Sequence, residues 1–351
     1  MSTHSAFNRP LGRRGVLLGA AAAGLAPAIA RAQQAAGLEA AANQEGAVSF
    51  YTSIDVAVAE KMTAAFTARY PKIQLRVERS GAERILQRLM QENQSEIHAA
   101  DVVESSDVTS FVDWKQRGWL APYVPDDVGQ YWPKEERDPD GTFAAVRAHL
   151  SVVGYNTKQV TAADAPTSLA DLLQPKWRMR MVKAHPSYSG TILTATFAVT
   201  QALGWDYLEK LAKQRVLQVQ SSTEPPKKVV QGERSIMCDG NEYDAFFLRE
   251  AGEPIEIVYA TEGSPLIPGQ AGVMKQAPHP NAARLFANFL FSQDCQQLMS
   301  DVGGLRSFHP KVVLKPGRKP LSDIKVLRSD PAELAKASAG IKQRYAQVFG
   351  V

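Results

Sequence analysis

The sequence is poor in cysteine and lacks the motifs of the common enzyme classes. Its 351 residues include only two cysteines, Cys238 and Cys295, which are too few for a disulfide framework and are expected to be free thiols. No GxSxG, HExxH, GxGxxG, P-loop or CxxC motif occurs, and no two of the scattered histidines have metal-ligand spacing. These absences favour a binding protein over an enzyme.

The sequence also lacks an excess of either charge beyond its N-terminal segment. Residues 1–32 contain four arginines and no acidic residue, which accounts for the whole formal net charge of +4. The rest of the chain therefore has no charge imbalance that would indicate nucleic acid or an anionic membrane surface as a partner.

The N-terminal segment, residues 1–32, has the layout of an export signal. Arg13-Arg14 precedes an apolar stretch, residues 16–30, that is too short to span a ~30 Å hydrocarbon core as a helix. Ala30-Arg31-Ala32 places small residues where signal peptidase reads, which predicts cleavage before Gln33. The paired arginine indicates the twin-arginine route, with an ordinary basic export signal as the alternative. Both routes predict a periplasmic mature chain.

From residue 47 onward, short apolar strands alternate with amphipathic helices. Residues 48–51, 73–77 and 100–103 have the pattern of strands, and the helix at 58–70 repeats apolar residues every fourth position. This alternation predicts βαβ units on a parallel sheet. Residues 119–145 have the composition of an ordered loop, and a strand at 150–155 begins a second series of units.

The two series of units predict an α/β fold that follows the export signal at 1–32.

Ligands of doubly wound sheets bind beyond the carboxyl ends of the strands, at the N-termini of the following helices. Hydroxyl-bearing residues stand at four such places in this sequence. The richest, Ser187 to Thr191, includes a glycine that lets the backbone approach a ligand, and free N–H groups at a helix start favour an anion. Each hydroxyl could instead be an ordinary helix cap. The candidates are Ser53, Asp55, Ser80, Ser106, Ser189, Gly190 and Thr191.

A fifth candidate segment combines acidic and aromatic residues after the strand that ends at Cys238. It contains Glu242, Tyr243 and Asp244 within three positions. Their oxygen atoms suit a hard metal ion or an ammonium group. Alternatively, the acids cap a helix and complement its dipole.

Ten segments together resemble the periplasmic solute-binding proteins of ABC importers, in the group that binds ferric iron, polyamines, thiamine, phosphonates or sugar phosphates. These segments are residues 48–53, 79–81, 100–103, 118–123, 153–157, 169–177, 189–191, 262–264, 272–273 and 280–296. The resemblance implies a periplasmic-binding-protein fold, in which two doubly wound sheets joined by hinge strands form two lobes that enclose a small-molecule ligand without a cofactor. It places the first lobe at 46–149 with a return at 263–310, the second lobe at 150–262, and a C-terminal tail and helix at 311–351. It also implies a monomer that meets the membrane only through an ABC permease and its ATPase.

The resemblance departs from the iron-binding pattern of two adjacent tyrosines, a histidine and a glutamate. Tyr243 matches one tyrosine, but Asp244 replaces the other, Asp55 falls at the histidine and Ser106 near the glutamate. The Ser-Gly-Thr turn at 189–191 is intact. The resemblance therefore implies an organic anion or zwitterion, such as a phosphonate or phosphate ester, whose amine would face the nearby carboxylates.

Three alternatives to this interpretation remain open at the level of the sequence. Ferric iron could be held by Tyr243, Asp244 and Asp55. The chain could be an exported enzyme, or it could be a ligand-sensing partner of a membrane receptor.

Overall fold

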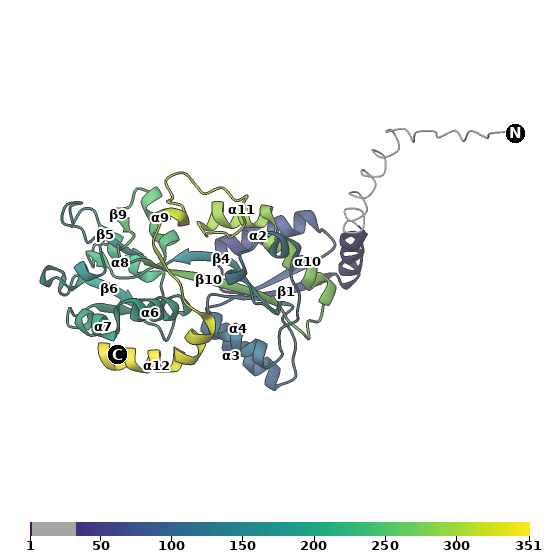
Figure 1. Ribbon diagram of the computed structural model, residues 1–351, viewed down its shortest axis with the longest axis horizontal. Coiled ribbons are helices and arrows are strands. Elements are labelled where there is room, and N and C mark those ends of the chain that lie inside the picture. The colour runs from purple at the N-terminus through teal and green to yellow at the C-terminus, as the bar shows by residue number, and fades with distance from the viewer. Residues whose placement is uncertain (2–32) are drawn as a thin grey trace.

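The computed structural model describes residue 1 and residues 33–351, so the predicted export signal and its cleavage site lie outside the described residues. Within residues 33–351, two β-sheets occupy the two ends of an elongated molecule (Figure 1). Their strand orders are β11-β10-β3-β1-β2, with β4 paired to β10, and β7-β6-β8-β5-β9. The predicted two-lobe α/β architecture is confirmed. No helix of residues 33–351 combines the length and the apolar character needed to cross a bilayer.

The first lobe contains a mixed sheet covered by helices. Its strands are β1 (Ala47–Thr52), β2 (Gln74–Arg79), β3 (Val102–Ser105), β4 (Ala144–Leu150), β10 (Ser264–Val273) and β11 (Val326–Leu327). Its helices are α2 (Val56–Arg69), α3 (Ala82–Gln94), α4 (Val108–Gln116), α5 (Asp126–Tyr131), α10 (Pro280–Phe291) and α11 (Gln293–Gly303). β1 is parallel to β2 and β3, as the βαβ pattern predicts, whereas β10 is antiparallel to β3 and β4.

The second lobe repeats this design on a smaller scale. Its strands are β5 (Val153–Asn156), β6 (Met181–Ala184), β7 (Leu217–Val219), β8 (Ile236–Met237) and β9 (Ile255–Val258). Its helices are α6 (Gly190–Leu203), α7 (Trp205–Ala212), α8 (Glu224–Val230) and α9 (Glu242–Glu250). Its short 3₁₀ helices lie at Ala170–Leu173 and Pro175–Trp177, and two others lie outside this lobe at Lys134–Glu136 and Leu321–Asp323. β6 is parallel to β7 and β8, and β5 is antiparallel to β8 and β9.

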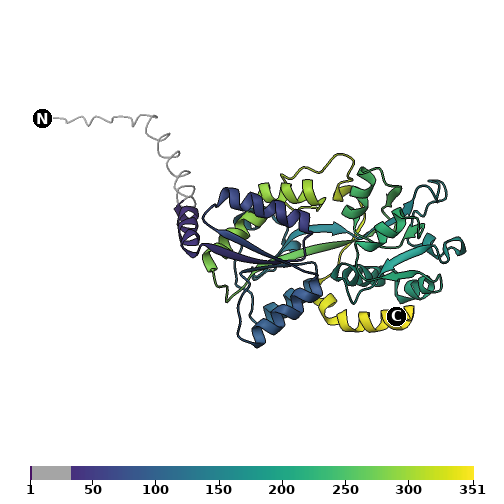
Figure 2. The same cartoon turned by 180° about the vertical axis from the view of Figure 1, so that it is seen from behind.

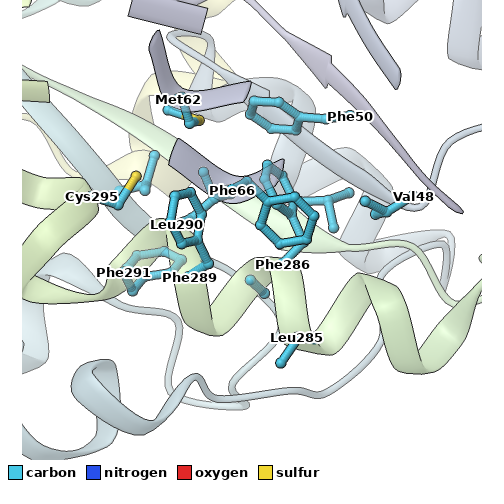
Figure 3. Packing of buried hydrophobic residues seen from close by; sticks show 14 of the residues in the cluster. Val48, Phe50, Met62, Phe66, Leu285, Phe286, Phe289, Leu290, Phe291 and Cys295 are labelled. Atoms are coloured by element: carbon cyan, nitrogen blue, oxygen red, sulfur yellow. The ribbon is translucent and has the colours of Figure 1, made fainter. Parts of the chain in front are cut away.

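The core of the first lobe is an aromatic cluster between its sheet and α2, α10 and α11 (Figure 3). The ring of Phe66 in α2 meets that of Phe286 edge-on at 5.1 Å, and Phe286 meets Phe50 of β1 at 4.9 Å. All three side chains are fully buried, and Phe66 lies on the apolar face of the predicted helix. Burial of such rings is a main source of stability. Cys295 belongs to this core and Cys238 to that of the second lobe, and both thiols are free as predicted.

The lobes are connected by the β4–β5 and β9–β10 segments and by the C-terminal part of the chain. After α11, Arg306 exchanges two backbone hydrogen bonds of 2.7 Å with Ala148 of β4. The chain then ends in α12 (Pro331–Phe349), which packs against α4 in the first lobe and against α6 and α7 in the second. Figures 1 and 2 show this helix in yellow along one side of the molecule.

Strand β4 corrects the prediction of a loop at 119–145 and of a single strand at 150–155. Helix α5 falls inside the predicted loop, β4 already begins at Ala144, and the strand predicted at 150–155 is the separate β5, which starts at Val153. Every side chain of β4 is buried, including Arg147 and His149. These two polar residues interrupt the apolar run, and such residues are normally read as exposed.

Candidate ligand-binding cleft

A cleft with a cavity volume of about 100 Å³ is lined by residues of both lobes. The first lobe contributes Ser53, Arg79, Gly81, Ala82, Ser106, Arg147 and His149, and the second contributes Tyr188, Ser189, Gly190, Thr191, Ser221, Ser222, Thr223 and Tyr243. Two arginines, a histidine and a large set of hydroxyl groups thus share one cavity. Such a lining suits a small polar ligand that carries negative charge.

Three helices begin at this cleft. Gly81, Ser189 and Thr223 are the N-cap residues of α3, α6 and α8, and all three line the cavity. Ser189 caps α6 by accepting a hydrogen bond of 3.4 Å from the backbone N–H of Ile192. The first N–H groups of a helix have no partner inside it, and the helix dipole adds positive potential at the same end. At α3 and α6 these groups favour an anion in the cleft. The start of α8 offers no free N–H, because that of Glu224 donates to the carbonyl of Ser221 (3.1 Å) and the next two residues are prolines.

A buried ion pair forms the first-lobe wall. Glu104 is fully buried and accepts hydrogen bonds from Arg147 Nε (2.9 Å) and the Ser53 backbone N–H (2.9 Å). Arg147 Nη2 donates to Glu104 Oε1 (2.8 Å) and to Ser53 Oγ (3.2 Å). The carboxylate thus compensates the buried guanidinium and fixes its orientation, and buried pairs need such additional hydrogen bonds. Arg147 and Ser53 are pre-positioned at the cleft.

His149 uses one ring nitrogen within the first lobe and the other across to the second. Arg147 Nη1 donates to Nδ1 (3.4 Å), and Nε2 lies 3.2 Å from Thr191 Oγ1 in the second lobe. Burial and the charges of Arg147 and Arg318 hold the pKa of His149 well below its ordinary value, so the ring is neutral. Because Nδ1 accepts, the ring proton is on Nε2 and is donated to Thr191. The hydroxyl hydrogen of Thr191 is then available to a ligand.

Tyr243 lines the cleft beside the carboxylate of Asp244. Asn241 Nδ2 donates to Tyr243 Oη and to Asp244 Oδ2, both at 2.9 Å, which holds the two side chains together. Burial, with a contribution from the charge of Asp55, raises the pKa of Asp244 to about 7. Burial and the charge of Asp244 raise the pKa of Tyr243. Within residues 33–351, no three His, Cys, Asp or Glu side chains are grouped so as to hold a metal ion.

Glu242 belongs to a buried ion cluster outside the cleft lining. Its carboxylate is fully buried and accepts hydrogen bonds from Arg306 Nε (2.8 Å), Arg318 Nη2 (2.8 Å) and Tyr259 Oη (2.5 Å). The cluster ties α9 to the C-terminal segment. The structure thus assigns Glu242 a contact with the tail of the chain.

Comparison with known proteins identifies the family. The model of the bacterial extracellular solute-binding proteins matches residues 98–320 of this chain. The chain belongs to this family. The solute-binding protein is 22% identical to Iron uptake protein A1 of Synechocystis sp., with 82% of each chain covered.

Two solved structures confirm the two-lobe fold of the solute-binding protein. Iron-bound HitA from Pseudomonas aeruginosa has a TM-score of 0.75 at 22% identity, covering 85% of this chain and 99% of HitA. AfuA from Actinobacillus pleuropneumoniae, with fructose-6-phosphate bound, has a TM-score of 0.79 at 21% identity, covering 87% of this chain and 99% of AfuA. The family match thus confirms the resemblance to solute-binding proteins, and these structures confirm the fold.

The sequence-predicted site residues of this solute-binding protein fall into two groups. Those that line the cleft are Ser53, Ser106, Ser189, Gly190, Thr191 and Tyr243. Those outside its lining are Asp55, Ser80, Glu242 and Asp244. Asp55 is exposed and caps α2 through the backbone N–H of Ala57 (3.1 Å). Asp244 still lies beside Tyr243, whereas Glu242 is occupied by arginines.

Several cleft residues of this solute-binding protein escaped the sequence analysis. Residues 221–223 have the same signal as 187–191, a run of hydroxyls before a helix start, and could have been found. Arg79 is the last residue of β2. Arg147 and His149 carried no usable signal, because their strand was itself missed.

Proposed function

We propose that this protein is the periplasmic binding component of an ABC importer and that it captures a small organic anion for a membrane permease and its ATPase. The leading ligand class is a phosphate ester or a phosphonate. The observation that carries the proposal is the start of α6, Ser189-Gly190-Thr191, which faces Arg147 and His149 across one cleft. Helix N–H groups, hydroxyls and a fixed guanidinium are the groups that bind phosphoryl oxygens.

Binding uses both lobes and requires no covalent step. The α6 start donates backbone and side-chain hydrogen bonds from the second lobe, and the guanidinium of Arg147, already paired with Glu104, is held at the cleft from the first. A ligand that touches both lobes binds the closed arrangement more tightly than an open one and so shifts the population toward closure. Closure removes water from the ligand, so its charge must be matched by these groups.

The double variant Ser189→Ala/Thr191→Ala tests the proposal on the mature chain. Hydrogen bonds to charged groups contribute about 1.5–3 kcal/mol each, so we expect the affinity for phosphate esters to fall at least about tenfold. Isothermal titration with inorganic phosphate, glycerol 3-phosphate and phosphate esters of ring-form sugars measures this loss. Thr200→Ala is a matched control, because Thr200 lies on the same helix but outside the cleft lining. Unchanged affinity of the double variant removes the α6 start from the site.

Ferric iron is the second candidate ligand, and the placement of Tyr243 in the cleft favours it. Tyr243, Asp244 and Asp55 would be the ligands. A relative is named an iron uptake protein, and HitA is iron-bound. Titration with ferric citrate tests this alternative: a visible phenolate–iron band that Tyr243→Phe abolishes would support iron in place of the organic anion.

A further inference from the structure

Tyr188 is a large aromatic side chain left exposed in an otherwise polar cleft. It is 59% exposed, yet it lines the cavity. It directly precedes Ser189, the N-cap of α6, and therefore stands one residue from the proposed anion site. An aromatic ring exposed at a binding cleft offers an apolar face that a ligand can cover.

The ring of Tyr188 is supported from behind by two further aromatic rings. The ring centroids of Tyr188 and His185 are 5.3 Å apart, and those of His185 and Tyr345 are 4.9 Å apart. Tyr345 of α12 is fully buried and donates a hydrogen bond of 2.6 Å to Gln218 Oε1. The three rings thus form a row that runs from the interior of the second lobe to the cleft.

The loop that carries Tyr188 is also held by hydrogen bonds. The backbone N–H of Tyr188 donates to the carbonyl of His185 (3.2 Å), and the N–H of Ser187 donates to His185 Nδ1 (3.0 Å). Burial, together with the charge of Lys183, lowers the pKa of His185, so its ring is neutral and can accept this hydrogen bond. A side chain held in place before binding loses less conformational entropy when a ligand covers it.

We propose that Tyr188 is a stacking platform that makes the cleft select anions attached to a ring over inorganic phosphate and acyclic phosphate esters. This inference rests on the proposed function, because the platform acts on a ligand whose anion is held at residues 189–191. A phosphoryl group at the α6 start brings the first atoms of its organic substituent beside Tyr188. The flat C–H face of a five- or six-membered ring then packs on the aromatic ring, whereas a short acyclic chain covers less of it.

Titrations of the mature chain with inorganic phosphate, glycerol 3-phosphate, glucose 6-phosphate, fructose 6-phosphate and ribose 5-phosphate test the inference. We expect at least one cyclic sugar phosphate to bind more tightly than glycerol 3-phosphate. Tyr188→Ala should then weaken that cyclic ligand about tenfold, as expected for the loss of one stacking contact, while the acyclic probes change far less. Tyr188→Phe keeps the ring and should stay within about twofold of the wild type. Met179→Ala, another exposed apolar side chain of the second lobe (58% exposed), is the control.

The outcomes separate this inference from the proposed function. If no phosphate compound binds, or if Ser189→Ala/Thr191→Ala changes no affinity, the proposed phosphate-ester site at the α6 start fails and the platform fails with it. If the double variant weakens every probe but Tyr188→Ala weakens cyclic and acyclic probes equally, only the platform is wrong. The platform is also wrong if the wild-type protein binds none of the three sugar phosphates more tightly than glycerol 3-phosphate.

Discussion

Gly190 at the start of α6 packs directly against Asp107, the N-cap residue of α4, across the boundary between the lobes. A Cβ atom placed on Gly190 would lie 3.0 Å from the Cβ of Asp107 and 3.1 Å from its backbone nitrogen. Real Cβ atoms rarely approach other atoms this closely. The absence of a side chain at Gly190 therefore permits the two helix starts to meet, and with them the two halves of the cleft.

Gly190→Ala should weaken ligand binding by disfavouring closure. The added methyl group pushes α6 away from α4, so we expect about a 3- to 30-fold loss of affinity, equivalent to roughly 0.7–2 kcal/mol. The free energy of unfolding should change by less than about 1 kcal/mol, because separation of the two helix starts relieves the contact with Asp107. Calorimetry gives the affinity, and small-angle scattering shows whether the ligand still compacts the protein. Wild-type affinity with full compaction would contradict this role of Gly190.

Glu242→Gln should destabilise the protein strongly at neutral pH. The change removes the negative charge that compensates Arg306 and Arg318, and breaking a buried ion pair costs about 3–5 kcal/mol. Urea denaturation at pH 7 measures the loss, with Glu60→Gln as the control because Glu60 is exposed on α2. A loss below about 1 kcal/mol would show that the cluster contributes little.

The stability difference between the wild type and Glu242→Gln should depend on pH. Burial raises the pKa of Glu242, but the hydrogen bond from Arg306 and the charges of Arg318 and Arg306 outweigh burial and hold the pKa below its ordinary value. A carboxyl group with a lowered pKa in the folded state stabilises the protein above its unfolded pKa, and this contribution is lost as the pH falls. The difference in free energy of unfolding between the wild type and Glu242→Gln should therefore become smaller as the pH is lowered.

The contribution of Asp244 to stability should have the opposite pH dependence to that of Glu242. Its pKa is raised from 3.8 to about 7, mainly by burial, so the folded state holds this proton more tightly than the unfolded chain does. Its contribution to stability is present below the unfolded pKa and declines as the pH rises through 4 to about 7. Asp244→Asn should remove this decline and raise the melting temperature relative to wild type at pH 8. If the melting temperatures of the two proteins change with pH in parallel between pH 4 and 8, the raised pKa of Asp244 is refuted.

The sequence by itself determined the features that depend on neighbouring residues. The spacing of apolar residues along α2 and the alternation of strands with helices follow from local periodicity, and they were enough to predict two α/β lobes. The hydroxyls and the glycine at 189–191 are also a local signal, because a helix start exposes its N–H groups whatever the rest of the fold does.

Only the tertiary structure decided what the charged residues do. Glu104 meets Arg147 from 43 positions away, and His149 meets Thr191 from 42 positions away in the other lobe. Glu242, which local composition made a ligand candidate, is instead compensated by Arg306, 64 residues further along the chain. A buried charge is stable only beside its partner, and that partner is brought close by the packing of whole lobes.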